Sequence, residues 1–281
     1  MHEFVFLLIG GLCHFGDRRI PMQALERDWG TMHLNLSGGD GTALVFINSL
    51  GTDLRMWDAV TSRLPASLRA LRMDKRGHGL SGTGSQGYRI SDLAEDVIAA
   101  MDHVGIARAV IVGCSIGGLI AQHIALMTPG RVIGLVLSNT ASKLGAAEGW
   151  LERIEAVRVN GMAAMADNIL RRWFGQAMLD RPEAALWRQM LARTDAEGYI
   201  ATCAAIAGAD ITDRLGEIAH PALVLGGQHD LATPPEVVAN LAQALPRADF
   251  LMFETTGHLP AVEAPEAFAD ALIKFVERIT G

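Results

Sequence analysis

The stretch Gly113-Cys114-Ser115-Ile116-Gly117 decides the fold, because it places the pattern Gly-x-Ser-x-Gly between two segments of different character. The apolar, β-branched run 109–112 precedes it, and residues 119–126 follow it with a helical pattern. A strand, a sharp turn and a helix in this order hold a serine in strained backbone geometry with its hydroxyl exposed. Glycines are needed on both sides because side chains there would collide with the following helix. The motif therefore predicts that Ser115 is a nucleophile.

The overall composition is that of a soluble globular enzyme. The chain has 281 residues, of which 50% are hydrophobic and 20% charged, with a formal net charge of −7. No basic run is present to neutralise phosphates, so nucleic acid is not expected as a partner. The three cysteines, Cys13, Cys114 and Cys203, form no Cys-x-x-Cys motif, and no metal-ligand spacing is visible. We therefore expect a reducing, cytoplasmic location and neither metal nor cofactor.

The N-terminal segment is the least regular part of the sequence. Residues 4–12 are apolar, but His2 and Glu3 precede them where a signal peptide would carry basic residues. The run is too short to span a bilayer, so no membrane partner is expected. We interpret residues 1–31 as an N-terminal extension of uncertain structure, followed by the domain proper from about Met32.

Short apolar segments alternate with helical patterns, which predicts an α/β fold with a mostly parallel sheet flanked by helices. The expected strands are 42–47, 68–73, 109–112, 132–137, 222–225 and 249–253, and the expected helices include 53–63, 91–104 and 264–279. The alternation breaks at 141–215, which has no convincing strand. We expect this segment to be a helical lid, inserted after the strand ending near Leu137. The core would then comprise 32–140 and 216–281, with its site at the carboxyl ends of the strands.

A serine nucleophile needs a base and a group that orients the base. In the Gly-x-Ser-x-Gly architecture the chain order is serine, acid and histidine, each after a strand. Asp230 follows the strand-like segment 222–225, and His258 follows 249–253. We therefore predict a triad in which His258 takes the proton of Ser115 and Asp230 fixes the imidazole tautomer.

Other groups with suitable chemistry are less favoured as catalysts. Cys114 could act as a nucleophile, but its place in the turn points into packing. His78, His123 and His229 are interpreted as structural, because the reaction needs only one base.

An acyl-transfer site also needs hydrogen-bond donors for the oxyanion. The residue after the nucleophile supplies one backbone N–H, which here belongs to Ile116. The second is expected from the loop after the strand 42–47, and the Leu50 N–H is our candidate because Gly51 allows close backbone approach.

These residues together resemble the α/β-hydrolase superfamily. The matching strings are 113–118, Asp-x-Arg-Gly-His-Gly-x-Ser at 74–81, Gly-x-x-Asp at 227–230 and Gly-His-Leu-Pro at 257–260, with Glu263 and Pro265. Within the superfamily, the strings 48–57, 74–81, 137–141 and 172–174 resemble 3-oxoadipate enol-lactonases. The resemblance covers the chain from about Met32 to its C-terminus. The first thirty residues have no counterpart in that family, and Cys114 replaces a more usual bulky aliphatic residue.

The resemblance implies hydrolysis of 3-oxoadipate enol-lactone to 3-oxoadipate, through an acyl-enzyme, in aromatic catabolism. The substrate would be a small anionic lactone, and a carboxylate is well matched by the two-pronged guanidinium of arginine. Among the arginines of the insertion we favour Arg172. Trp173, Trp150 and Ser49 are further candidates for contacts with the substrate.

Other functions on the same scaffold remain open at this point, because the insertion sets the substrate. They are a carboxylesterase, a carbon–carbon bond hydrolase, a cofactor-free perhydrolase, or a ligand sensor that turns over slowly.

Overall fold

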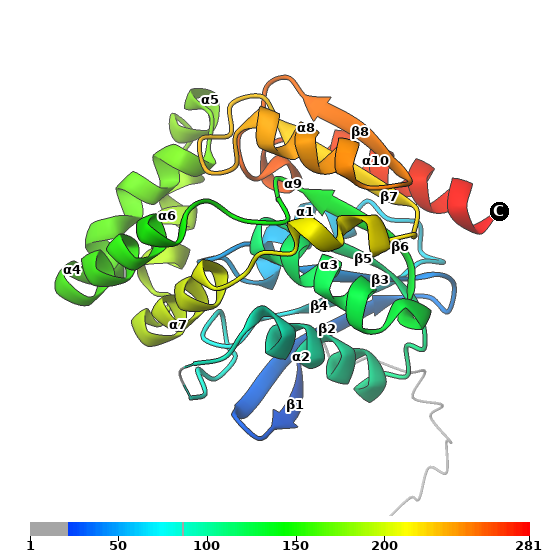
Figure 1. Cartoon of the computed structure of the whole chain (residues 1–281), viewed down its shortest axis with the longest axis horizontal. Helices are drawn as coiled ribbons and strands as arrows, with labels where there is room; N and C mark the ends of the chain where they lie inside the picture. Colours follow the sequence, from blue (N-terminus) through cyan, green and yellow to red (C-terminus); the bar gives the residue numbers. More distant parts are fainter. Residues whose placement is uncertain (1–21, 86) are drawn as a thin grey trace, which may run out of the picture.

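The computed structural model describes residues 22–85 and 87–281, which form one eight-stranded sheet flanked by helices (Figure 1). The strand order is β1-β2-β4-β3-β5-β6-β7-β8. The pairs β1–β2 and β2–β4 are antiparallel and every other pair is parallel. The expected α/β class is confirmed. The strands are β1 Gln23–Arg27, β2 Gly30–Gly38, β3 Ala43–Ile47, β4 Arg69–Met73, β5 Ala109–Cys114, β6 Val132–Ser138, β7 Ala222–Gly227 and β8 Ala248–Phe253.

The sheet begins at Gln23, so the start near Met32 expected from the sequence is too late. Strands β1 and β2 form a hairpin that joins the sheet through β4. The inward side chains of β2 are Met32, Leu34 and Leu36, which alternate with less buried residues as one face of a strand requires. The rest of the expected N-terminal extension, residues 1–21, lies outside the described residues.

The central strands are buried on both faces. All residues of β3 and β5 are buried, as expected for parallel strands covered by helices on each side. Helix α10 has the amphipathic pattern that the sequence predicts, with Phe268, Leu272 and Phe275 in the core. The flanking helices are α1 Asp58–Thr61, α2 Ile90–His103, α3 Ile116–Met127, α8 Pro235–Ala244, α9 Pro260–Glu263 and α10 Pro265–Thr280, with 3₁₀ turns η1 Leu54–Trp57, η2 Pro129–Arg131 and η3 Thr212–Glu217.

Four helices lie between β6 and β7 and gather on one side of the molecule, at the left of Figure 1. We call them the helical insertion; they are α4 Ala147–Trp173, α5 Gln176–Leu179, α6 Ala184–Ala192 and α7 Ala196–Ala207. Gly161 interrupts the helical backbone of α4 with a φ of 73° and ψ of 167°. The segment contains no strand, in agreement with the sequence pattern.

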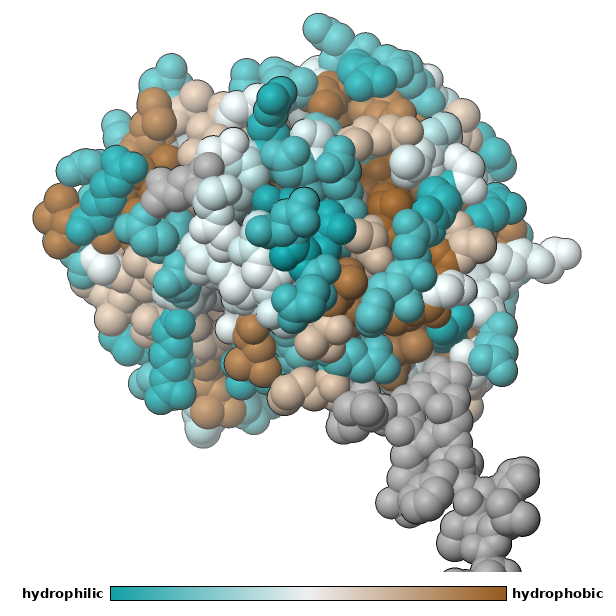
Figure 2. Space-filling view, turned by 90° about the horizontal axis from the view of Figure 1, so that it is seen from below, coloured by the Kyte–Doolittle hydropathy of each residue, from teal (hydrophilic) through white to brown (hydrophobic). Residues whose placement is uncertain are grey.

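Hydrophilic side chains cover much of the face shown in Figure 2, with hydrophobic residues between them. Across the described residues, none of the helices combines the length and the apolar character needed to span a bilayer.

Candidate active site

Ser115 occupies the turn between β5 and α3 in a backbone conformation that L-residues rarely adopt, with φ 57° and ψ −120°. The turn is possible because glycines allow close approach of the backbone. A Cβ at Gly113 would lie 2.2 Å from the Gly117 carbonyl oxygen, and one at Gly117 would lie 2.1 Å from that of Ile47. Both contacts are far below any real Cβ contact, so the sequence motif and the strained turn require each other.

Asp230 and His258 form the second part of the site. His258 Nδ1 lies 2.7 Å from Asp230 Oδ2, and both side chains are almost completely buried. The other oxygen, Asp230 Oδ1, accepts hydrogen bonds from the backbone N–H groups of Ala232 and Thr233 at 2.7 and 2.9 Å. The carboxylate is therefore fixed by its own loop, and it leaves His258 Nε2 as the ring nitrogen available for proton transfer.

Ser115 and His258 line the same cavity. Among the described residues, the Ser115 hydroxyl makes no hydrogen bond. Catalytic hydrogen bonds in unliganded sites often tighten only when substrate binds, so this geometry is compatible with a serine–histidine pair.

Asn139 contacts Asp230 and the loop that carries His258, an interaction that the sequence reasoning missed. Its Nδ2 donates to Asp230 Oδ2 at 2.9 Å and to the Gly257 carbonyl at 3.1 Å. Asn139 has a φ of 50°, which asparagine tolerates better than most residues. In the sequence, Asn139 stands out only as part of the string 137–141. The contact depends on β6 and β7 being neighbours in the sheet, which the string does not reveal.

The two backbone N–H groups predicted to bind the oxyanion belong to residues close to Ser115. Leu50 lines the cavity beside Ser115, and Ile116 is the first residue of α3, where backbone N–H groups have no partner within the helix. Within the described part of the chain, the Leu50 N–H donates no hydrogen bond. Both groups are thus available to an anionic oxygen at the site.

The cavity has a volume of about 560 Å³ and lies between the core and the helical insertion. The four residues expected to contact substrate, Arg172, Trp173, Trp150 and Ser49, all line it. Arg153 lines it as well, and the sequence reasoning had not singled it out from the other arginines of the insertion. The Arg153 guanidinium carbon lies 5.0 Å from the centre of the Trp150 ring, a cation–π contact.

The two arginines of the cavity influence each other. Partial burial, and then the positive charge of Arg153, lower the pKa of Arg172. In the part of the chain that the structure describes, neither guanidinium forms an ion pair with a carboxylate. The basic side chains of Lys143, Arg153 and Arg172 outnumber the one carboxylate of the lining, Glu152, and this excess of positive charge favours an anionic ligand.

The helical insertion is hydrogen-bonded to the loop that carries His258. The His258 backbone N–H donates to the Trp173 carbonyl oxygen at 2.5 Å. The Glu263 carboxylate accepts from Gly175 N at 3.1 Å and from Gly257 N at 2.8 Å. Burial raises the pKa of Glu263 to about 7, although these N–H groups act in the opposite direction. The end of α4 and the loop that carries His258 are thus held by one set of contacts.

The alternative residues occupy structural environments. Cys114 is buried, and burial raises the pKa of its thiol far above the usual range. Buried His78 bonds the Arg76 carbonyl through Nδ1 at 2.9 Å, and burial lowers its pKa. His123 lies in α3 against the Leu119 carbonyl, and His229 is exposed. The described residues include no cluster of three or more His, Cys, Asp or Glu side chains suited to a metal ion.

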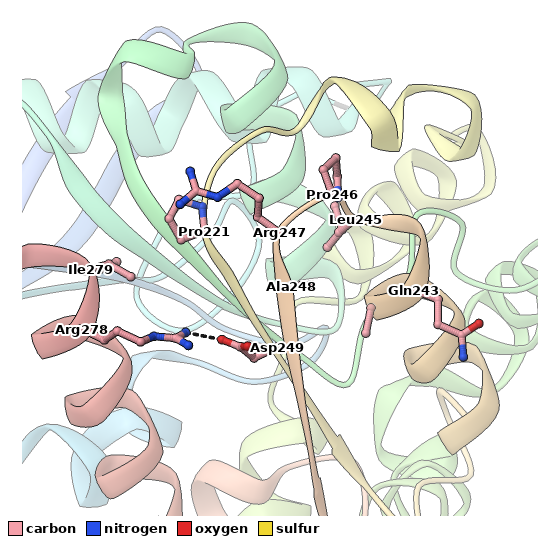
Figure 3. A pocket seen from close by; sticks show the side chains of 10 residues that line it. Pro221, Gln243, Leu245, Pro246, Arg247, Ala248, Asp249, Arg278 and Ile279 are labelled. Carbon is pink, nitrogen blue, oxygen red and sulfur yellow. Dashed lines mark hydrogen bonds and ion pairs between the residues drawn. The ribbon is translucent and has the colours of Figure 1, made fainter.

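A second hollow, of about 720 Å³, lies at the amino-terminal ends of β7 and β8, away from Asp230 and His258 (Figure 3). Its lining includes Pro221, Arg247 and Ala248, with an ion pair between Asp249 and Arg278. Asp230 and His258 follow the carboxyl ends of the same strands. The hollow contains no nucleophile paired with a base, so the site built around Ser115 is the better candidate for catalysis.

Known proteins are similar to this chain over most of its length. The family described as alpha/beta hydrolase fold matches residues 42–265. Two relatives from Acinetobacter baylyi are 3-oxoadipate enol-lactonase 2, 36% identical over 85% of this chain and 90% of that protein, and 3-oxoadipate enol-lactonase 1, 32% identical over 90% and 96%. The crystal structure of the enol-lactonase from Burkholderia xenovorans LB400 superposes with a TM-score of 0.87 at 36% identity, covering 91% of this chain and all of that one. With its strained serine turn and mostly parallel sheet, the chain belongs to the α/β-hydrolase fold family.

Proposed function

We propose that the protein is a serine hydrolase that opens a small anionic lactone, and that this lactone is 3-oxoadipate enol-lactone. The observation that carries the proposal is the cavity itself. It brings Ser115 and His258 together with Arg153 and Arg172, two cations without a carboxylate partner in the described chain. Similarity to enol-lactonases over most of the chain supports the choice of substrate.

In the proposed reaction, His258 removes the proton from the Ser115 hydroxyl, and the serine oxygen attacks the lactone carbonyl. The N–H groups of Leu50 and Ile116 stabilise the tetrahedral oxyanion. The ring carbon–oxygen bond then breaks, the His258 imidazolium gives its proton to the departing oxygen, and the resulting enol remains attached to the acyl-enzyme. Because an enolate is a good leaving group, this step asks little of the imidazolium as an acid.

The acyl-enzyme is resolved by water. His258 takes a proton from a water molecule, the resulting hydroxide attacks the ester, and Ser115 leaves with the proton from the imidazolium. The released enol tautomerises to the ketone, which gives 3-oxoadipate. Asp230 stabilises the imidazolium in both halves of the reaction, and Asn139 holds Asp230 in place.

The substrate carboxylate would bind to the arginines of the cavity. A guanidinium bonds both oxygens of a carboxylate, and hydrogen bonds to charged groups contribute roughly 1.5–3 kcal/mol each. We also propose that the helical insertion acts as the lid, since it supplies both arginines and covers the carboxyl ends of β5, β6 and β7.

The test is the loss of enol-lactone ultraviolet absorbance in the presence of purified protein, compared with hydrolysis of p-nitrophenyl acetate. We expect Ser115→Ala to abolish both activities. Arg172→Met and Arg153→Met should raise KM for the lactone by about 10-fold or more. The same variants should change hydrolysis of the uncharged ester by less than about twofold.

Arg171→Met is the matched control. Arg171 adjoins Arg172 and, like it, is exposed, but Arg171 bonds Asn168 and does not line the cavity. If the protein cleaves p-nitrophenyl acetate through Ser115 but does not open the lactone above background, the protein is a general esterase and the substrate assignment is wrong.

A further inference from the structure

Lys75 carries a buried amino group that no step of the proposed reaction uses. It lies just beyond the carboxyl end of β4, and only 4% of the residue is exposed. Its Nζ donates a hydrogen bond of 2.8 Å to the Ser49 carbonyl oxygen. Burying a cation is costly unless it is paired, and within the described residues Lys75 forms no ion pair. The fold therefore buries this amino group with one backbone carbonyl as its hydrogen-bond acceptor.

The nearby carboxylates are engaged elsewhere. Asp74 accepts from Leu54 N and Leu80 N at 2.8 and 2.9 Å and from the His33 ring, and Asp53 pairs with Arg55. These contacts leave the carbonyl of Ser49 as the hydrogen-bond acceptor of Lys75.

The Ser49 carbonyl belongs to the same peptide group as the Leu50 N–H. The structure contains no cis peptide bond in the described chain, and in a trans peptide the C=O and N–H point in opposite directions. Fixing the carbonyl toward Lys75 therefore directs the Leu50 N–H to the opposite side of that peptide. Leu50 lines the cavity together with Ser115 and His258.

Thr52 acts on the same carbonyl. Its Oγ1 donates to Ser49 O at 2.9 Å and its backbone N–H donates at 3.3 Å. Three donors thus converge on this oxygen. Hydrogen bonds to the carbonyl of an amide polarise it, which makes its N–H a stronger donor.

We propose that Lys75 is a positioning residue of the oxyanion hole, which orients and polarises the Ser49–Leu50 peptide so that the Leu50 N–H can stabilise the anionic oxygen. The inference rests on the proposed serine-hydrolase function of the site but not on the identity of the lactone. Lys75 acts through Leu50 and does not touch the substrate.

The experiment uses p-nitrophenyl acetate as substrate and phenylboronic acid as a probe that adds to the serine to form a tetrahedral adduct. Lys75→Met keeps the length of the side chain and removes its charge and donors. We expect kcat to fall by about 10- to 100-fold while KM stays within about twofold. The inhibition constant of the boronic acid should rise by a similar factor, because the adduct places an oxygen at the same donors.

Thr52→Val provides an independent variant that leaves the charge in place. It removes the Oγ1 donor and should lower kcat by about 3- to 10-fold with KM unchanged. Lys274→Met makes the same chemical change on the exposed side of α10 and should leave all three constants unaltered.

The outcomes separate the two proposals. If activity survives Ser115→Ala, the proposed serine-hydrolase function itself is wrong. If Ser115 is required but both Lys75→Met and Thr52→Val retain the wild-type kcat and boronic acid affinity, the role of Lys75 is overturned. A parallel change in kcat and KM together with lost thermal stability would also overturn it, because that pattern indicates a structural contribution only.

Discussion

Replacing Lys75 with methionine is expected to make the protein more stable at pH 6, even though it impairs the proposed oxyanion hole. Burial lowers the pKa of Lys75 from 10.5 to about 7, with Asp74 and Asp53 acting in the opposite direction. The folded protein therefore holds this proton less tightly than the unfolded chain does. A pKa lowered from 10.5 to about 7 means that the charged form destabilises the fold by about 5 kcal/mol.

The sign of the pH dependence follows from that difference. Below pH 7 the amino group is charged in both states, and the full cost of burial is present. Between pH 7 and 10.5 the unfolded chain binds the extra proton, so stability rises with pH, and above 10.5 the cost is gone. The charged and titratable groups facing Lys75 are Asp53, Asp74, Cys114 and His78. They are present in both proteins, so most of their own titration cancels in the comparison.

The net gain in the free energy of unfolding of Lys75→Met is smaller than the destabilisation caused by the buried charge. Methionine loses the hydrogen bond to Ser49 O, and a bond from a charged donor contributes about 1.5–3 kcal/mol. The carbonyl is not orphaned, because the two donors of Thr52 remain. We therefore expect Lys75→Met to gain about 2–4 kcal/mol at pH 6.

Urea denaturation of the wild type, Lys75→Met and the control Lys274→Met at pH 6, 7.5 and 9 measures this effect. The advantage of Lys75→Met should shrink as the pH rises. The reasoning is refuted if the variant is less stable than the wild type at pH 6, or if the gap between them does not depend on pH.

Three further predictions concern the acid, the core and the serine turn. Asp230→Asn should lower kcat for p-nitrophenyl acetate by about 10³- to 10⁴-fold, because the imidazole loses its orienting charge; circular dichroism checks that the fold is kept, and a loss below tenfold would contradict the role. Phe268→Ala should cost about 3–5 kcal/mol in urea denaturation, since this fully buried ring packs against Trp57 and Phe253 with centroids 5.8 and 6.3 Å away. Gly117→Ala should destabilise by at least about 3 kcal/mol because its Cβ would lie 2.1 Å from Ile47 O, whereas Gly149→Ala in α4, with open space around it, should change stability by no more than about 1 kcal/mol; similar values for the two would refute the steric account.

The parts of the fold that could be predicted are those whose signal is local in the sequence. The motif at 113–117 forces a strand before it and a helix after it, and both were found as β5 and α3. The hairpin of β1 and β2 was missed because its strands are only partly buried and precede the parallel alternation. The helix expected at 53–63 is a 3₁₀ turn followed by the short α1, in which Asp53 caps the first turn.

The contacts of the candidate site depend on sheet order, which the sequence pattern does not encode. Asp230 and His258 could be paired from their places after two strands, because parallel strands end at one edge. Asn139, Arg153 and Lys75 could not be assigned this way. A lysine in a glycine-rich loop is usually solvated, and only the packing of β4 beside β3 puts Lys75 beneath the Ser49–Leu50 peptide.

The hydrogen bond from His258 N to Trp173 O has a consequence for exchanging parts between relatives. The helical insertion and the loop that carries His258 are in close backbone contact, because Gly257 has so little clearance that a Cβ there would lie 2.3 Å from the Trp173 oxygen. A chimera in which the foreign insertion extends through residue 175 would place a foreign backbone at this contact and shift the imidazole of His258 with it. The exchanged segment should therefore end upstream of Trp173. Residues 173–175 then stay with the sheet, and the foreign segment replaces only part of the cavity wall.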